Sequence, residues 1–192
     1  MTLDEARELM HEWVSSEALR THMEAVATCV AAYAQKLEPD EVERWTVCGL
    51  LHDFDYERNP STAEHPFLGV KELERRGVDE EIRTAILGHA DYSGVPRTSS
   101  LAKSLYACDE LAGFIVACCK VRPNGIGDLE PKSVKKKLKD RAFAAAVNRE
   151  DIARGVSELG PVCGVTDPAA FQTEHIQTCI DALRDNRQAL GV

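Results

Sequence analysis

The sequence predicts an all-α fold. Apolar residues recur at the three- and four-residue spacing of helices along almost the whole chain, and clusters of β-branched residues bounded by turns are missing. Of the 192 residues, 44% are hydrophobic and 29% are charged, a composition typical of globular proteins. A chain of this length can bury a core without disulfides. We therefore expect one domain over residues 1–192, built as a helical bundle.

The first half of the chain contains five predicted helices, each supported by residues that begin or end helices. Ser16 can cap the second helix, and Pro39 precedes the acidic first turn of the third. Gly77 follows the basic pair Arg75 and Arg76 and is expected to end the fourth. These helices are predicted at residues 4–14, 16–36, 40–53, 66–76 and 79–90.

The second half of the chain contains four more predicted helices. Two segments with Gly and Pro, at 89–100 and 121–131, are expected to be loops, and neither is long or polar enough to link two domains. Pro168 is a suitable first residue for the last helix. The four helices are predicted at 99–120, 131–147, 149–159 and 168–190.

Composition also argues against several classes of partner. The longest apolar run, at 111–119, is too short to cross a bilayer, and the N-terminus is acidic where an export signal would be basic. Seven cysteines without a C-x-x-C pair indicate reduced, structural thiols. A net charge of −9 would repel nucleic acid. We expect a soluble, cytoplasmic protein with no membrane or nucleic-acid partner; the oligomeric state is left open.

Several ionisable residues fall on helix faces that are otherwise apolar. His22 shares a face with Leu19 and Val26, and Asp109 shares one with Leu105 and Ala112. Taken singly, each could be a hydrogen-bonded core histidine or an ion-paired acid. Taken together, imidazoles and carboxylates on facing helices are what a divalent cation needs, and the cation makes their burial tolerable. Residues of this kind are His22, His52, Asp53, His89 and Asp109.

The order His22, then the adjacent pair His52 and Asp53, then Asp109 resembles the HD superfamily of metal-dependent phosphohydrolases, whose fold is all-α. The segments EHPFLGVKEL and ILGHADYSG resemble the later histidine segments of HD subfamilies that hold two metals. The resemblance covers about 19–116, and a helical C-terminal extension follows at about 131–190. Part of that extension, PKSVKKKLKDRAFAAAVNRE, resembles a group of stand-alone predicted HD hydrolases.

The resemblance implies a site and an activity. One or two divalent transition metals, such as Fe, Mn or Zn, would act on a phosphomonoester or phosphodiester bond in a small, nucleotide-like substrate. Asp53 would bridge the two cations, and it would be catalytic together with His65 and His89. With one metal, those two histidines would instead contact the phosphate or protonate the leaving oxygen. The implied metal ligands are His22, His52, Asp53, His65, His89 and Asp109.

Departures from the family pattern leave alternatives open. The double histidine and G-Y-P signature of the HD-GYP proteins are absent, and Tyr56 replaces the lysine of the H-D-I-G-K variant. A metal-stabilised nucleotide-binding or regulatory module without turnover, or a di-iron HD oxygenase, would keep the same ligands. Asp55, Glu57 and Arg58 are either site residues or a solvated helix end. The basic segment 132–141 either binds substrate phosphates or is an exposed helix face.

Overall fold

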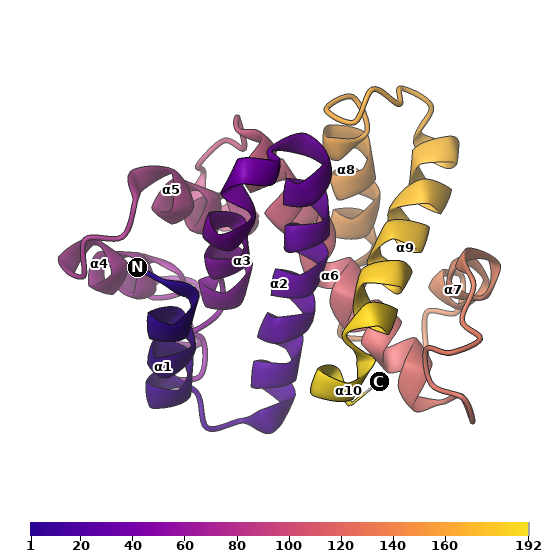
Figure 1. Ribbon diagram of the computed structural model, residues 1–192, viewed down its shortest axis with the longest axis horizontal. Helices are drawn as coiled ribbons and strands as arrows, with labels where there is room; N and C mark the ends of the chain where they lie inside the picture. The colour runs from indigo at the N-terminus through magenta and orange to yellow at the C-terminus, as the bar shows by residue number, and fades with distance from the viewer. Residues whose placement is uncertain (192) are drawn as a thin grey trace.

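The computed structural model describes residues 1–191, and within that range it contains helices and no strand, as the sequence predicts. Figure 1 shows the helices as one packed bundle. The elements, in chain order, are α1 (Leu3–Trp13), α2 (Glu17–Leu37), the 3₁₀ turn η1 (Pro39–Glu41), α3 (Val42–Leu51), α4 (Phe67–Arg75), α5 (Glu80–His89), the 3₁₀ turn η2 (Asp91–Ser93), α6 (Ser100–Lys120), α7 (Pro131–Leu138), α8 (Arg149–Leu159), α9 (Pro168–Asp185) and α10 (Arg187–Leu190).

The two longest helices, α2 and α6, pack against each other in the middle of the bundle. Helix α3 covers α2 on one side and α9 covers it on the other, while α5 and α8 pack on α6. In Figure 1, α1, α3, α4 and α5 lie to one side of α2, and α7, α8 and α9 lie to the other. The apolar stripes predicted from helical spacing are buried in this arrangement, because each faces a neighbouring helix.

Two glycines let neighbouring helices approach closely where the ionisable residues lie. A Cβ atom on Gly49 of α3 would lie 2.7 Å from the Cα atom of Ala27 in α2, so no larger residue fits there. A Cβ atom on Gly155 of α8 would lie 2.6 Å from the Cα atom of Ala107 in α6. The first contact brings the end of α3 toward His22, and the second brings α8 against the part of α6 that carries Asp109.

The helix predicted at 131–147 is too long, because α7 ends at Leu138. The guanidinium of Arg149 donates to the carbonyl oxygen of Ala144 at 2.6 Å, to that of Val147 at 2.5 Å, and to that of Phe143. Ala144 adopts a positive φ of 45°, which no helix contains. Hydrogen bonds from a residue outside the segment thus replace the helical ones, and the apolar pattern gave no sign of this.

Two other predicted helices are shorter than expected. The helix predicted at 40–53 begins as a 3₁₀ turn and ends at Leu51, so His52 and Asp53 lie in the turns that follow it. The helix predicted at 168–190 is interrupted at Asn186, whose side chain donates to the carbonyl oxygen of Ala182 and leaves α10 as a separate turn. Polar side chains that hydrogen-bond nearby backbone compete with helix continuation in this way.

All seven cysteines are free, and six of them are buried. Among residues 1–191, no helix combines the length and the hydropathy needed to cross a membrane.

Candidate metal centre

The six ionisable residues predicted to hold metal come from five separate parts of the chain, and the fold brings them together. His22 lies in α2, Asp109 in the middle of α6, and His89 is the last residue of α5. His52 and Asp53 follow α3, and His65 precedes α4. Two groups of donor atoms result, each with all its atoms within 4.8 Å of one another; they are His22, His52 and Asp53, and Asp53, His65 and His89.

The first group, together with Asp109, joins the long helices α2 and α6 to the end of α3. The Nε2 atom of His22 lies 3.2 Å from Nε2 of His52 and 3.1 Å from Oδ1 of Asp109. The Nε2 atom of His52 lies 3.4 Å from the same oxygen of Asp109. Oδ2 of Asp53 is 3.8 Å from His22 and 3.5 Å from His52. Four side chains therefore face one small volume.

The second group forms a nearly equilateral triangle. Oδ1 of Asp53 lies 3.3 Å from Nε2 of His65 and 3.4 Å from Nε2 of His89, and the two nitrogens are 3.3 Å apart. Ligands at about 2.1 Å from one cation stand about 3.0–3.4 Å apart for octahedral or tetrahedral angles. The spacing therefore fits three ligands of one metal. Because Asp53 presents Oδ2 to one group and Oδ1 to the other, it is placed to bridge two cations.

Three of the imidazoles are oriented by hydrogen bonds at Nδ1. Nδ1 of His52 donates to the carbonyl oxygen of Gly49 at 2.8 Å, and Nδ1 of His89 donates to that of Ile86 at 2.5 Å. Nδ1 of His65 donates to Oδ1 of Asp55 at 2.8 Å. A ring with its proton on Nδ1 presents a lone pair at Nε2, and this is the tautomer that a metal-binding histidine uses.

The Nε2 atoms of neighbouring histidines face one another, and this arrangement bears on whether the residues fit a metal. With the protons of His52, His65 and His89 on Nδ1, Nε2 lone pairs point at one another across 3.3 Å between His65 and His89. Lone pairs at that distance repel unless a proton or a cation lies between them. Nitrogen and carboxylate oxygen donors suit a borderline divalent cation such as Zn, Mn or Fe. The donor set fits the expected metal.

Asp55 supports the second group through a hydrogen bond with His65, on the side of the ring away from the other donors. Only 1% of its side chain is exposed, and its Oδ2 atom accepts the backbone N–H of Gly69 at 2.8 Å while Oδ1 accepts from His65. A Cβ atom on Gly69 would lie 2.6 Å from Cγ of Asp55, so glycine is required there for the carboxylate to fit. Asp55 is therefore not part of a solvated helix end, because it touches a candidate ligand rather than solvent.

Charge in the cluster is balanced internally. Burial opposes a charged ring, yet Asp53 and Asp109 raise the pKa of His52 to about 9. Burial likewise opposes charge on His65, but Asp53 and Asp55 raise its pKa to about 9. Burial alone would raise the pKa values of Asp53 and Asp109, but the facing histidines hold both well below the ordinary range. Without metal, protons on the imidazoles therefore compensate the carboxylates, and a divalent cation would take over this role.

A cleft of about 500 Å³ opens beside the second group. It reaches His65, His89 and Asp109, so a small molecule in the cleft would touch the donor cluster. The sequence did not single out most of its other lining residues, which come from η2, α6 and the start of α8. The acidic first turn of α8 was the only feature of the sequence that could have indicated these residues, and acidic residues are equally expected there because they stabilise a helix N-terminus. These other residues are Tyr56, Ala90, Asp91, Tyr92, Tyr106, Glu110, Asn148, Glu150, Asp151 and Arg154.

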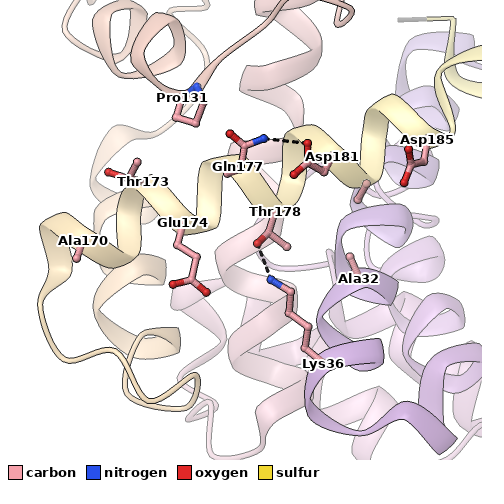
Figure 2. Close-up of a pocket in the computed structure, with 11 residues that line it drawn as sticks. Ala32, Lys36, Pro131, Ala170, Thr173, Glu174, Gln177, Thr178, Asp181 and Asp185 are labelled. Carbon is pink, nitrogen blue, oxygen red and sulfur yellow. Dashed lines mark hydrogen bonds between the residues drawn. The ribbon is translucent and has the colours of Figure 1, made fainter.

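Two other surface features lie apart from the cluster. None of the six basic residues in 132–141 lines the cleft; Lys136 and Lys137 border a separate hollow of about 370 Å³. Figure 2 shows a hollow of about 710 Å³ between α2, α9 and the start of α7, crossed by a hydrogen bond from Lys36 to Thr178. In the part of the chain that the structure describes, no candidate metal group includes a residue of either hollow.

Comparison with known proteins gives one match. A family model described as HD domain matches residues 19–113, a span that begins in α2 and ends in α6 and includes all six candidate ligands. No curated protein and no solved structure matches the chain.

Proposed function

Since residues 19–113 form an HD domain, the domain type of a metal-dependent hydrolase superfamily, we propose that this protein hydrolyses a phosphomonoester or phosphodiester bond at two divalent cations. The observation that carries the proposal is the pair of donor groups sharing Asp53, one on each of its carboxylate oxygens. One cation would explain either group, but both groups with a common carboxylate call for two.

The proposed ligands divide by location. His22, His52 and Asp109 would hold one cation, His65 and His89 would hold the other, and Asp53 would bridge them. Cations bound there would neutralise phosphoryl charge and lower the pKa of an attacking water. The second group lies at the cleft, so a phosphate would enter on the side of His65 and His89.

The remaining residues orient this machinery and limit water. Asp55 fixes the ring of His65, and the carbonyl oxygens of Gly49 and Ile86 fix His52 and His89. His52 is fully buried, whereas His65, His89 and Asp109 border the cleft, so water reaches the cluster from the cleft side. No serine or cysteine nucleophile is needed, and none of the described residues that line the cleft is a serine or a cysteine.

The test is metal analysis of protein purified without added metal or chelator, combined with hydrolysis of aryl phosphate monoesters and diesters. We expect about two metals per chain and activity that a chelator removes and added metal restores. The variant Asp109→Ala should lose the metal held by the first group, and it should therefore also lose hydrolytic activity. Bound metal without hydrolysis of any ester would contradict the proposal and indicate a binding module, whereas oxygen-dependent turnover would indicate the oxygenase alternative.

A further inference from the structure

One part of the cleft wall carries more negative charge than its neighbours compensate. Asp91 is neutralised, because Arg97 lies 2.8 Å from one of its oxygens and Arg154 pairs with the other. Three further acids line the same cleft without such a partner. Within residues 1–191, no ion pair is formed by Glu110, Glu150 or Asp151.

The few hydrogen bonds of these acids come from neutral groups. Asp151 accepts from the hydroxyl of Tyr106 at 3.0 Å, and Glu110 accepts the backbone N–H of Asn148 at 3.1 Å. Glu150 is exposed at the cleft. Carboxylates with neutral partners stay available to a cation that enters the cleft.

Two tyrosines border the same cleft and expose their rings. Tyr56 is 46% exposed and Tyr92 is 50% exposed, which is unusual for large aromatic residues, and Tyr56 lies edge-on to His65 with ring centroids 5.1 Å apart. Tyrosine rings offer a negative face to cations, most of all to quaternary and primary ammonium groups. Aromatic faces and unpaired carboxylates around one cavity are the usual components of an ammonium site.

The charge of a ligand can be read from the two sides of the cleft. Two divalent cations and the carboxylates of Asp53 and Asp109 leave a formal charge of about +2, which one phosphate dianion would balance. A second phosphate would then face Glu150 and Asp151, and like charges there would repel it. An ammonium group in that position would instead meet these two carboxylates.

We propose that the substrate is a phosphomonoester of an amino alcohol, with its phosphate at the donor cluster and its ammonium group among Tyr56, Tyr92 and the carboxylates of Glu150 and Asp151. This inference rests on the proposed phosphohydrolase function and adds the charge of the organic group. It separates the protein from enzymes for polyphosphates, whose clefts need basic residues along the phosphate chain.

The test uses two esters of the same shape. Phosphocholine and 3,3-dimethylbutyl phosphate differ only in the replacement of the quaternary nitrogen by carbon, so their ratio of kcat/KM measures the charge effect. We expect the metal-loaded protein to prefer phosphocholine by about tenfold or more, and high salt should reduce the preference. In the double variant Glu150→Gln/Asp151→Asn the ratio should fall toward one. The matched variant Glu8→Gln, which changes an exposed acid of α1, should keep it.

Calorimetric titration of the metal-loaded protein with both esters gives a readout that does not require turnover. Tighter binding of phosphocholine with no hydrolysis would support the ammonium site and contradict the proposed function. Hydrolysis of both esters with a ratio near one, or a ratio that the double variant leaves unchanged, would overturn the inference and leave the phosphohydrolase intact. A preference for a nucleoside monophosphate over phosphocholine would also overturn it.

Discussion

Asp53 is the residue on which both donor groups depend. Its two oxygens face different histidines, 3.3 Å from His65 on one side and 3.5 Å from His52 on the other. Monodentate ligands such as the histidines serve one cation each, whereas a carboxylate can serve two. Replacing Asp53 therefore affects the whole centre, while replacing a histidine affects one group.

Asp53→Asn should abolish the bridge at nearly constant volume. We expect metal content to fall from about two per chain to below one, and ester hydrolysis to fall by about a thousandfold or more, because an amide offers only one acceptor oxygen. Metal analysis after gel filtration and a phosphatase assay measure the two effects. Asp40→Asn, at an exposed position, is the control. Full metal occupancy in Asp53→Asn would contradict the bridging role.

Asp55→Asn should weaken metal binding without direct contact to the cation. The amide removes the charge that His65 faces and leaves one oxygen where Nδ1 of His65 and the N–H of Gly69 both need an acceptor. We expect metal affinity to fall about 10- to 100-fold. ¹⁵N NMR of the His65 ring should show loss of the single Nδ1–H tautomer, a signal that a merely structural role would not change. Unaltered affinity and tautomer would rule out positioning by Asp55.

At the scale of elements, the centre depends on how closely helices approach and where they end. Gly49 lets α3 approach α2, and Gly69 leaves room for a buried carboxylate beside α4. α3 ends at Leu51, and His52 and Asp53 follow it in turns from which both side chains reach the cluster.

Two helical glycines give a matched comparison. Alanine at Gly69 would place Cβ 2.6 Å from Cγ of Asp55 and push that carboxylate away from His65. Alanine at Gly113 would place Cβ 3.4 Å from Nδ1 of His22, which is an ordinary contact. We expect Gly69→Ala to lower metal affinity by about tenfold and Gly113→Ala to leave it nearly unchanged. Titration with Mn²⁺ measures both; equal affinities would contradict this account of α4.

Arg149 holds the segment between α7 and α8, which leads to the cleft residues of α8. Replacement by lysine keeps the charge but loses the fork that serves several carbonyl oxygens. We expect Arg149→Lys to lower the free energy of unfolding by about 2 kcal/mol. Urea unfolding followed by circular dichroism measures this, with Arg141→Lys at an exposed position as the control. Equal stability of the two variants would show that the segment does not need Arg149.

At the scale of the whole molecule, the buried centre links folding to metal and to pH. His52 and His65 have pKa values of about 9 in the metal-free fold, above the ordinary value of 6.5. Groups with raised pKa values stabilise the fold fully below the unfolded value, and that stabilisation is lost as the pH rises through the folded value. A bound metal would replace these protons, so the metal-bound protein should lack this dependence on pH.

The melting temperature of metal-free protein should therefore fall between pH 6.5 and about 9. Protein with saturating Mn²⁺ should not show this fall, because cations then balance Asp53 and Asp109, and its apparent metal affinity should rise with pH over the same range. Differential scanning fluorimetry with and without chelator compares the two. Parallel melting curves in both states would contradict a metal centre at these residues.

The sequence by itself determined the all-α class, most helix positions and the identity of the six clustered residues. Apolar spacing is a local property of each helix, and the order of the histidines and aspartates can be read directly from the sequence. The single-domain organisation and the roles of the six residues stay predictions. The sequence did not predict that α7 ends at Leu138 or that the last helix is interrupted at Asn186. Hydrogen bonds from Arg149 decide the first, and a side-chain hydrogen bond from Asn186 to Ala182 decides the second.

Only the tertiary structure decided which atoms meet. The division of Asp53 between two groups, the burial of Asp55 and the cleft formed by η2, α6 and α8 depend on helices that are distant in sequence. Side chains on one helix share a face by periodicity, but contacts between helices follow from close approach at residues such as Gly49 and Gly155. Sequence spacing and the family resemblance therefore identified the candidate ligands, while packing set the distances between them and the charge of the cleft beside them.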